Sequence, residues 1–316
     1  MQMNMKRMCI VNRLLVSCVG LCMSLHAFAQ QEPMYSQYMF NMLNINPAYA
    51  GSRGAISAVA LYRNQWLGFP GAPRTTSFSF DMPLQNKKIG VGAQFYDDRI
   101  GIERTTGFNA IYAFRFQFAG SGTLSLGLQA GLLNYQANYT EVNTYVPNDP
   151  AFSSNVRGIL PAFAAGVYYN SDKFYVGFST PALLKTKIQY NNAAEIASVT
   201  SRDLHLYFTA GTVFELNPDL ALKPSFLIKG VSGAPLEMDL NVNLWLQNKI
   251  ALGVSYRTGD AIVGMVEYQF NQQFRFGYAY DKTFSNLGTL VNGTHELMFR
   301  MEFGSPSVRV SSPRYF

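Results

Sequence analysis

The sequence is poor in charge, in cysteine and in long apolar runs. Charged residues are 14% of its 316 residues, against about 25% in a typical soluble domain. No apolar run of about 20 residues follows the N-terminus, which excludes a bundle of membrane-spanning helices. The abundant aromatic residues, 24 Phe and 19 Tyr, exclude a disordered chain. A β-rich fold remains, either in water or in a membrane.

The first 29 residues have the pattern of a secretory signal peptide. Basic residues (Lys6, Arg7, Arg13) precede an apolar stretch, residues 14–25, and Ala27-Phe28-Ala29 offers a cleavage site before Gln30. Residues 15–18 also resemble a lipoprotein signal ending at Cys18, an alternative that the continuing apolar stretch disfavours. All three cysteines lie at positions 9, 18 and 22, so disulfides cannot stabilise the mature chain.

Removing the signal peptide also removes three basic residues and no acidic one. The formal charge therefore falls from +6 to +3, with 22 basic and 19 acidic residues remaining. This excess is too small to indicate a nucleic-acid-binding protein.

From Arg53 onward, apolar residues recur with a period of two. In Thr76–Met82, for example, Phe78 and Phe80 alternate with Ser77 and Ser79. Such alternation predicts strands with one apolar and one polar face. We expect fourteen strands of roughly the length that a tilted strand needs to cross a bilayer. They lie at residues 54–64, 74–83, 88–97, 105–118, 122–136, 159–170, 173–180, 203–216, 219–229, 235–247, 249–257, 260–270, 273–281 and 295–303.

The connections between these strands alternate in length. Tight turns rich in Asn, Gly, Pro and Asp follow the even-numbered strands, whereas long connections, at 137–158, 181–202 and 282–294, follow odd-numbered ones. Outer-membrane barrels have short periplasmic turns at one rim and longer loops at the other. We therefore predict an all-β fold, a 14-stranded antiparallel transmembrane β-barrel over 53–303 with long extracellular loops. A secreted soluble β-protein is the alternative.

Two segments lie outside the predicted barrel. In the N-terminal segment, residues 30–52, Tyr35, Tyr38, Met39 and Met42 have helical spacing, which predicts a short amphipathic helix that ends before Asn46-Pro47. We expect it to pack in or under the lumen on the periplasmic side, unless it is only a lead-in to the barrel. The second segment is a polar periplasmic tail, residues 304–316.

Glycines gather on the predicted inner face of four strands. Because glycine inside a strand often marks close approach of another backbone, we expect a docking wall for the N-terminal segment or a partner's peptide. Relief of strain where the barrel curves is the alternative. The wall comprises Gly90, Gly92, Gly127, Gly131, Gly166 and Gly177. Charged residues of both signs, from Asp81 to Glu302, also face inward, which favours a neutral cross-barrel network.

Signals of catalysis or metal binding are weak. The mature chain has two histidines, His205 and His295, and lacks a G-x-S-x-G or H-E-x-x-H motif. We therefore expect no enzyme, cofactor or metal site. A lipid-modifying barrel enzyme is therefore less favoured than either a protein-binding barrel or a passive diffusion porin.

Three stretches resemble the PorP/SprF family. They are M-Y-S-Q-Y-M-F-N-M-L-N-I-N-P-A-Y-A-G (residues 34–51), Y-R-N-Q-W (62–66) with F-P-G-A-P-R-T (69–75), and the final S-P-R-Y-F (312–316). The resemblance implies an outer-membrane barrel of type IX secretion and gliding motility. Its implied partners are a secreted adhesin carrying a C-terminal sorting domain, secretion or gliding components, and outer-membrane lipid.

We therefore expect a barrel that binds, anchors or assists export of such an adhesin, with a passive diffusion porin as the alternative. The expected contacts with partners lie in three places. They are the N-terminal segment (Tyr35, Tyr38, Phe40, Asn46, Pro47), an external loop (Leu183, Leu184, Ile188, Tyr190) and the tail (Arg314, Tyr315, Phe316).

Overall fold

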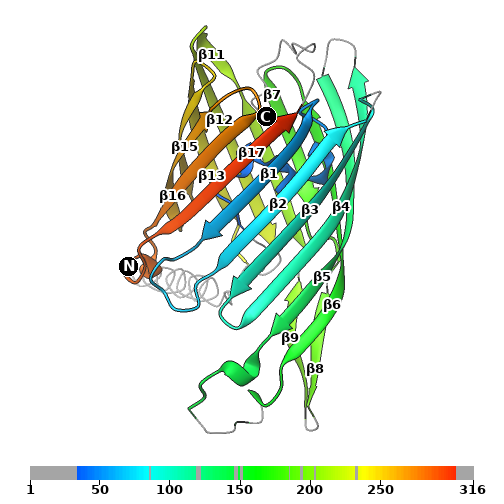
Figure 1. The fold of residues 1–316 in the computed structure, drawn as a ribbon, viewed down its shortest axis with the longest axis vertical. Coiled ribbons are helices and arrows are strands. Elements are labelled where there is room, and N and C mark those ends of the chain that lie inside the picture. The colour runs from blue at the N-terminus through cyan, green and yellow to red at the C-terminus, as the bar shows by residue number, and fades with distance from the viewer. Residues whose placement is uncertain are drawn as a thin grey trace, which may run out of the picture.

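The computed structural model describes residues 34–84, 87–118, 122–145, 149, 152–184, 186–192, 195–202, 204–231 and 234–303, with the backbone alone for 186–202. The predicted signal peptide and tail lie outside the described residues. No helix in the described part is long and apolar enough to cross a membrane. The structure is dominated by one large antiparallel sheet (Figure 1).

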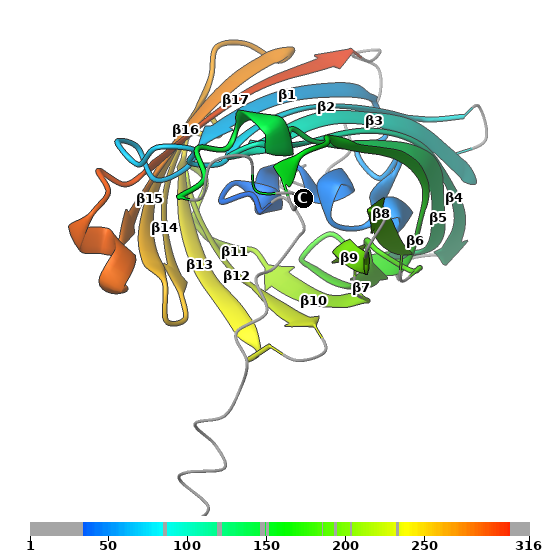
Figure 2. The same cartoon turned by 90° about the horizontal axis from the view of Figure 1, so that it is seen from below.

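The sheet closes on itself. Its strands are β1 (Ile56–Asn64), β2 (Arg74–Pro83), β3 (Ile89–Ile100), β4 (Glu103–Phe118), β5 (Gly122–Ala137), β6 (Val156–Asn170), β7 (Phe174–Thr180), β10 (His205–Thr212), β11 (Phe214–Asn217), β12 (Leu220–Val231), β13 (Glu237–Leu246), β14 (Ile250–Arg257), β15 (Ala261–Gln269), β16 (Phe274–Thr283) and β17 (Thr294–Phe303). Consecutive strands pair from β1 to β7 and from β12 to β17, and β1 pairs with β17. Between them, β10 pairs with both β7 and β12, and β11 pairs with β12. Since β10 and β11 are consecutive pieces of one wall strand, the predicted fourteen-stranded barrel is confirmed (Figure 2).

The period-two pattern separates the inside of the barrel from its lipid-facing surface. On β2, Ser77 and Ser79 are buried inside, while Phe78 between them is 45% exposed on the outer surface. On β13, Asn241 and Asn243 point inward and Val242 outward. The interior is therefore polar and the outer surface apolar, as a bilayer requires.

The two rims of the barrel differ. At the short-turn rim, the connections between described strands are brief (for example 171–173, 218–219, 247–249 and 270–273). The opposite long-loop rim carries 65–73, 138–155, 181–204 and 284–293, with the 3-10 helices η4 (Tyr139–Glu141) and η6 (Asn286–Thr289). By the general rule for such barrels, the short-turn rim faces the periplasm.

One predicted loop is not a plain loop. Residues 181–202 contain a hairpin of β8 (Thr186–Asn192) and β9 (Glu195–Arg202), which pair only with each other among the described strands. The alternation of Ile188 and Tyr190 ahead of Asn191-Asn192 was a signal for this hairpin.

The N-terminal segment is not the predicted amphipathic α-helix. It forms three 3-10 turns, η1 (Tyr38–Phe40), η2 (Met42–Asn44) and η3 (Pro47–Tyr49), and lies inside the barrel (Figure 2). Almost every residue from 35 to 51 is buried, so the segment has no solvent-facing side for an amphipathic helix to present. Asn41, whose backbone angles are not helical, separates the first two turns.

Candidate functional site

The candidate site is the lumen of the barrel, where residues 34–52 contact the inner wall along its depth. The upstream end of this segment is held near the long-loop rim. Glu296 accepts hydrogen bonds from the backbone amides of Ser36 and Gln37, each at 2.8 Å. Arg63 donates to Glu296 at 2.9 Å and to Asp281 at 2.8 Å, and the Ser36 hydroxyl also donates to Asp281. A buried carboxylate thus clamps two main-chain amides.

These residues form part of a buried ionic group that we call the outer cluster. Arg257 contacts Asp239 at 3.0 Å and Asp281 at 3.5 Å, and Lys229 contacts Glu237 at 2.6 Å and Asp239 at 3.0 Å. The outer cluster comprises Arg63, Lys229, Glu237, Asp239, Arg257, Asp281 and Glu296. Each member has at least one oppositely charged partner, as buried charges need, although Arg63 Nε and Asp281 Oδ1 make no hydrogen bond within the described part of the chain.

The middle of the segment is held by polar and aromatic contacts. Asn241 donates to the Tyr38 hydroxyl, and the Asn41 side chain donates to Ser79 at 3.0 Å. Burial raises the pKa of the Tyr38 hydroxyl well above its ordinary value, so this hydroxyl stays protonated. Phe40 meets Trp245 edge to face, with ring centroids 6.4 Å apart.

The downstream end of the segment lies against glycines of the wall. A Cβ on Gly90 would overlap the carbonyl of Ala50, and a Cβ on Gly127 would overlap the backbone of Pro47 and Ala48. Gly166 and Gly177 leave room for the Asn46 side chain in the same way. These four glycines therefore allow the segment to approach the backbone of the wall, as close approach requires.

The other two glycines of the predicted wall do not contact the segment. A Cβ on Gly92 would meet Phe80 and Asp81, and one on Gly131 would meet Phe108 and Asn109. Both are crowded by neighbouring strands, so neither supplies a contact with the N-terminal segment, and a docking role toward a partner's peptide stays a prediction for this pair.

Asn46 and Gly51 are fixed by hydrogen bonds. The Asn46 side chain accepts from the amide of Ala48, capping η3, and donates to the Val167 carbonyl at 3.0 Å. Asp81 accepts from the Gly51 amide at 2.8 Å, and Arg115 donates to the Gly51 carbonyl at 2.7 Å. Pro47 has no amide hydrogen to satisfy at the first position of the turn.

A second buried ionic group, the inner cluster, lies near the short-turn rim. Arg53 contacts Glu302 at 2.7 Å, and Arg275 contacts Glu267 at 3.2 Å. Lys223 and Arg275 lie over the ring of Trp245, 4.8 and 5.4 Å from its centroid. The inner cluster comprises Arg53, Asp81, Arg115, Lys223, Glu267, Arg275, Arg300 and Glu302.

We expected the segment to pack on the periplasmic side of the lumen. It instead spans both halves of the barrel. It contacts wall residues near the long-loop rim at Ser36 and residues near the short-turn rim at Gly51. The direction in which the segment runs through the lumen was not predictable from the sequence, because it depends on hydrogen bonds between residues about 260 positions apart.

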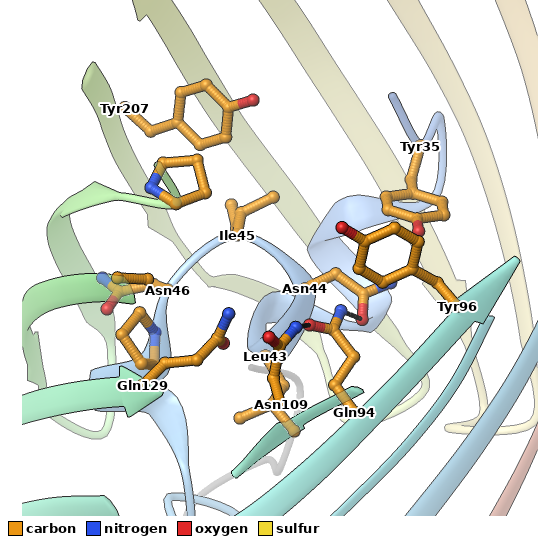
Figure 3. Close-up of a pocket in the computed structure, with 13 residues that line it drawn as sticks. Tyr35, Leu43, Asn44, Ile45, Asn46, Gln94, Tyr96, Asn109, Gln129 and Tyr207 are labelled. Carbon is orange, nitrogen blue, oxygen red and sulfur yellow. Dashed lines mark hydrogen bonds between the residues drawn. The ribbon is translucent and has the colours of Figure 1, made fainter. Parts of the chain in front are cut away.

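A small cavity remains between the segment and the inner faces of β3, β4, β5, β6 and β10 (Figure 3). Its volume is about 40 Å³, enough for about three waters. Gln94 bridges Asn44 and Asn109 on its wall, donating to Asn44 at 2.8 Å and accepting from Asn109 at 3.3 Å (Figure 3). Its polar lining residues are uncharged, which suits water and neutral polar groups.

A family model described as type IX secretion system membrane protein PorP/SprF matches residues 27–301. The chain belongs to the PorP/SprF family. Its site is therefore the lumen of a type IX secretion system membrane protein, and its location is the outer membrane. No curated protein matches the sequence.

Solved structures share the barrel architecture of this PorP/SprF protein. The toluene transporter TbuX of Ralstonia pickettii is 10% identical, with a TM-score of 0.50 over 88% of this chain and 96% of that one. The toluene transporter TodX of P. putida is 9% identical, with a TM-score of 0.45 over 83% and 93% of the two chains. The KdgM porin is 8% identical, with a TM-score of 0.40 over 78% and 99%. At these identities the likeness concerns the fold alone.

The external loops of the PorP/SprF barrel carry exposed apolar side chains. Leu183 and Leu184 are 45% and 43% exposed. Ile188 and Tyr190 lie on β8, where only the backbone is described. In the preceding loop, Tyr139 and Phe152 pack edge to face at 5.9 Å, while the Tyr145 side chain is fully exposed. The predicted tail contacts, Arg314, Tyr315 and Phe316, lie outside the described residues.

The histidines of the PorP/SprF barrel have ordinary structural surroundings. The ring of His295 lies 2.8 Å from the Tyr278 hydroxyl, and His205 is buried beside Tyr207. Among the described residues, no group of three His, Cys, Asp or Glu side chains is arranged to hold a metal ion.

Proposed function

We propose that this PorP/SprF barrel anchors a type IX-secreted surface protein, such as an adhesin, and assists its export through the protein's C-terminal sorting domain. Its further partners are secretion or gliding components in the periplasm or outer membrane. The family supplies the secretion context. The occupied lumen is the observation that favours anchoring over passive transport.

A diffusion porin needs an aqueous lumen wide enough for its solutes. Here Tyr38, Met42 and Tyr49 are buried in the interior, with exposed fractions of 1%, 1% and 2%. The clamp on Glu296 and the close fit on the glycine wall hold the segment at both ends. This arrangement disfavours the alternative of a passive porin.

The long-loop rim is the surface that a partner outside the cell can reach. Leu183 and Leu184 are exposed together there, and clusters of exposed apolar residues mark binding sites more often than isolated ones do. We assign contact with the exported protein to these residues and to Ile188 and Tyr190. The packing of Tyr139 on Phe152 supports the alternative that parts of these loops bury one another.

The test replaces residues 183–190 with a Gly/Ser linker. Under the proposal the barrel assembles, but the exported protein disappears from the cell surface or is shed into the medium. The matched control replaces residues 284–291, an equally long stretch of another loop on the same rim, and is expected to keep the exported protein on the cell. Equal surface display by both variants would contradict the assignment.

Liposome swelling separates the two candidate functions. If the lumen is plugged, liposomes that contain the barrel should take up small sugars, and swell, no faster than protein-free liposomes. Rapid swelling with the intact chain would favour the porin.

A further inference from the structure

We infer that the lumen is a directional peptide-binding site that can accept the C-terminal peptide of the exported protein in place of this chain's own residues 34–50. The inference rests on the proposed function, since that function supplies an exported protein held at the external face. The inference adds that the C-terminal peptide of the exported protein binds inside the lumen, and that it runs from the external face toward the periplasm.

The direction follows from the resident segment. Ser36 is bound by Glu296 and Asp281 beside the long-loop rim, and Gly51 by Asp81 and Arg115 toward the short-turn rim. The resident chain therefore runs from the external face toward the periplasm, N to C. A surface protein whose C-terminal end is bound in the lumen runs in the same direction, with its body outside the cell.

The wall binds the main chain of the segment as well as several of its side chains, such as those of Asn41 and Asn46. Glu296 accepts from two backbone amides, Ser179 donates to the Ile45 carbonyl at 2.6 Å, and Asp81 and Arg115 bind the Gly51 amide and carbonyl. Groups of this kind can bind a peptide of different sequence. The glycine wall imposes one condition, which is small residues where Ala48 and Ala50 now lie.

The charges of the lumen suit a peptide that enters with its carboxylate leading. The outer cluster has three basic and four acidic residues, whereas the inner cluster has five basic and three acidic ones. The surplus of positive charge thus lies at the periplasmic end. There, Arg300 is 1% exposed, and its Nε and Nη2 atoms make no hydrogen bond within the described part of the chain. A terminal carboxylate would complement these cations.

The resident segment competes with any incoming peptide. It is covalently attached through residues 52–55, which gives it a high effective concentration. A peptide can therefore bind only when residues 34–50 leave the lumen, so locking the segment in place should prevent binding.

The first experiment uses a variant that lacks residues 31–51 and dye-labelled peptides with the sequence of residues 34–51, whose terminal carboxylate takes the place of the Gly51 carbonyl beside Arg115. The peptide with a free C-terminal carboxylate should bind, and its amide should bind roughly tenfold to a hundredfold more weakly. The same residues in reversed order should not bind. Equal binding by forward and reversed peptides, or by acid and amide, would overturn the directional site.

The second experiment uses the full chain and does not depend on the deletion folding. Asn41 Nδ2 lies 3.0 Å from Ser79 Oγ, so Asn41→Cys and Ser79→Cys place two thiols on facing side chains, and the shift of the oxidised protein on a non-reducing gel identifies the disulfide. Cells carrying the oxidised, locked barrel should capture less exported protein than the same cells after reduction. Wild-type cells under both treatments control for the reagents.

If the locked and reduced barrels capture equal amounts, the lumen site is wrong. The loop replacement at 183–190 tests the proposed function separately. Loss of display in that variant together with no effect of the lock would leave the anchor function standing without the lumen site.

Discussion

A single methyl group on the glycine wall should displace the N-terminal segment. In Gly127→Ala, the new Cβ would overlap the backbone of Pro47 and Ala48, which cannot rotate aside as a flexible side chain could. Overpacking of this kind costs typically 1–3 kcal/mol and occasionally more. With backbone on both sides, we expect about 3 kcal/mol against docking of the segment, a shift of roughly a hundredfold in the docking equilibrium.

The matched control is Gly264→Ala on β15, where a Cβ would meet nothing within 4 Å. Alanine is favoured over glycine inside a strand by roughly 0.5–1 kcal/mol, so this control should be unchanged or slightly more stable. Any difference between the two variants then reports the contact with the segment and not the strand propensity of alanine.

The measurement is thiol labelling at position 42. The cysteines of the chain lie in its first 22 residues, so Met42→Cys supplies a unique thiol in the mature protein, at a position that is 1% exposed. Labelling by a soluble maleimide should be about a hundredfold faster in the Gly127→Ala background than in the Gly264→Ala background. Equal labelling rates, with both barrels still heat-modifiable, would refute the close fit that we describe.

Three further predictions follow from the occupied lumen and the tail. Glu296→Gln leaves Arg63 with one carboxylate partner and weakens the clamp on Ser36, so liposome swelling should increase, at a cost to docking of about 3 kcal/mol for breaking a buried ion pair. Deleting residues 31–45 should leave a heat-modifiable barrel that conducts small solutes, and unchanged conductance would contradict the plug. Removing residues 312–316 should spare folding but reduce co-purification of secretion components, compared with a Gly/Ser replacement of residues 286–290. Equal recovery would show that the tail does not bind them.

The barrel itself was predictable because its signal is local. The alternation of Ser77, Phe78 and Ser79 is visible within a few residues and gives the strand, its inner face and its environment together. Ordering the fourteen strands then required only that consecutive strands pair, which antiparallel barrels satisfy. The strand boundaries differ from the prediction by a few residues at most in nearly every case.

The interior was only partly predictable because its signals are not local. Spacing of Tyr35, Tyr38 and Met42 indicated an apolar stripe, but the conformation is set by what surrounds the segment on all sides. Glycines in β3, β5, β6 and β7 indicated close approach, yet nothing in the sequence distinguishes Gly127, which faces the segment, from Gly131, which faces a neighbouring strand. The partners of Glu296 lie about 260 residues upstream, beyond any periodic pattern.

The pairing of β1 with β17 also constrains the order of assembly. This seam joins the first and last strands of the barrel through backbone hydrogen bonds, and the segment inside the ring leads directly into β1. A ring that closes around its own preceding chain has two routes to the final state: the chain lies in place before the seam forms, or its free end is drawn through afterward. If the chain lies in place before the seam forms, the charged residues of the outer and inner clusters lose their water once, as the segment docks against them. If the chain is drawn through afterward, these residues are first buried without the segment and must be rehydrated as it passes. The segment can therefore serve as a template around which the sheet closes. A variant that docks the segment poorly should accumulate a folding intermediate with an open, protease-sensitive sheet, even where the stability of the folded barrel is unchanged.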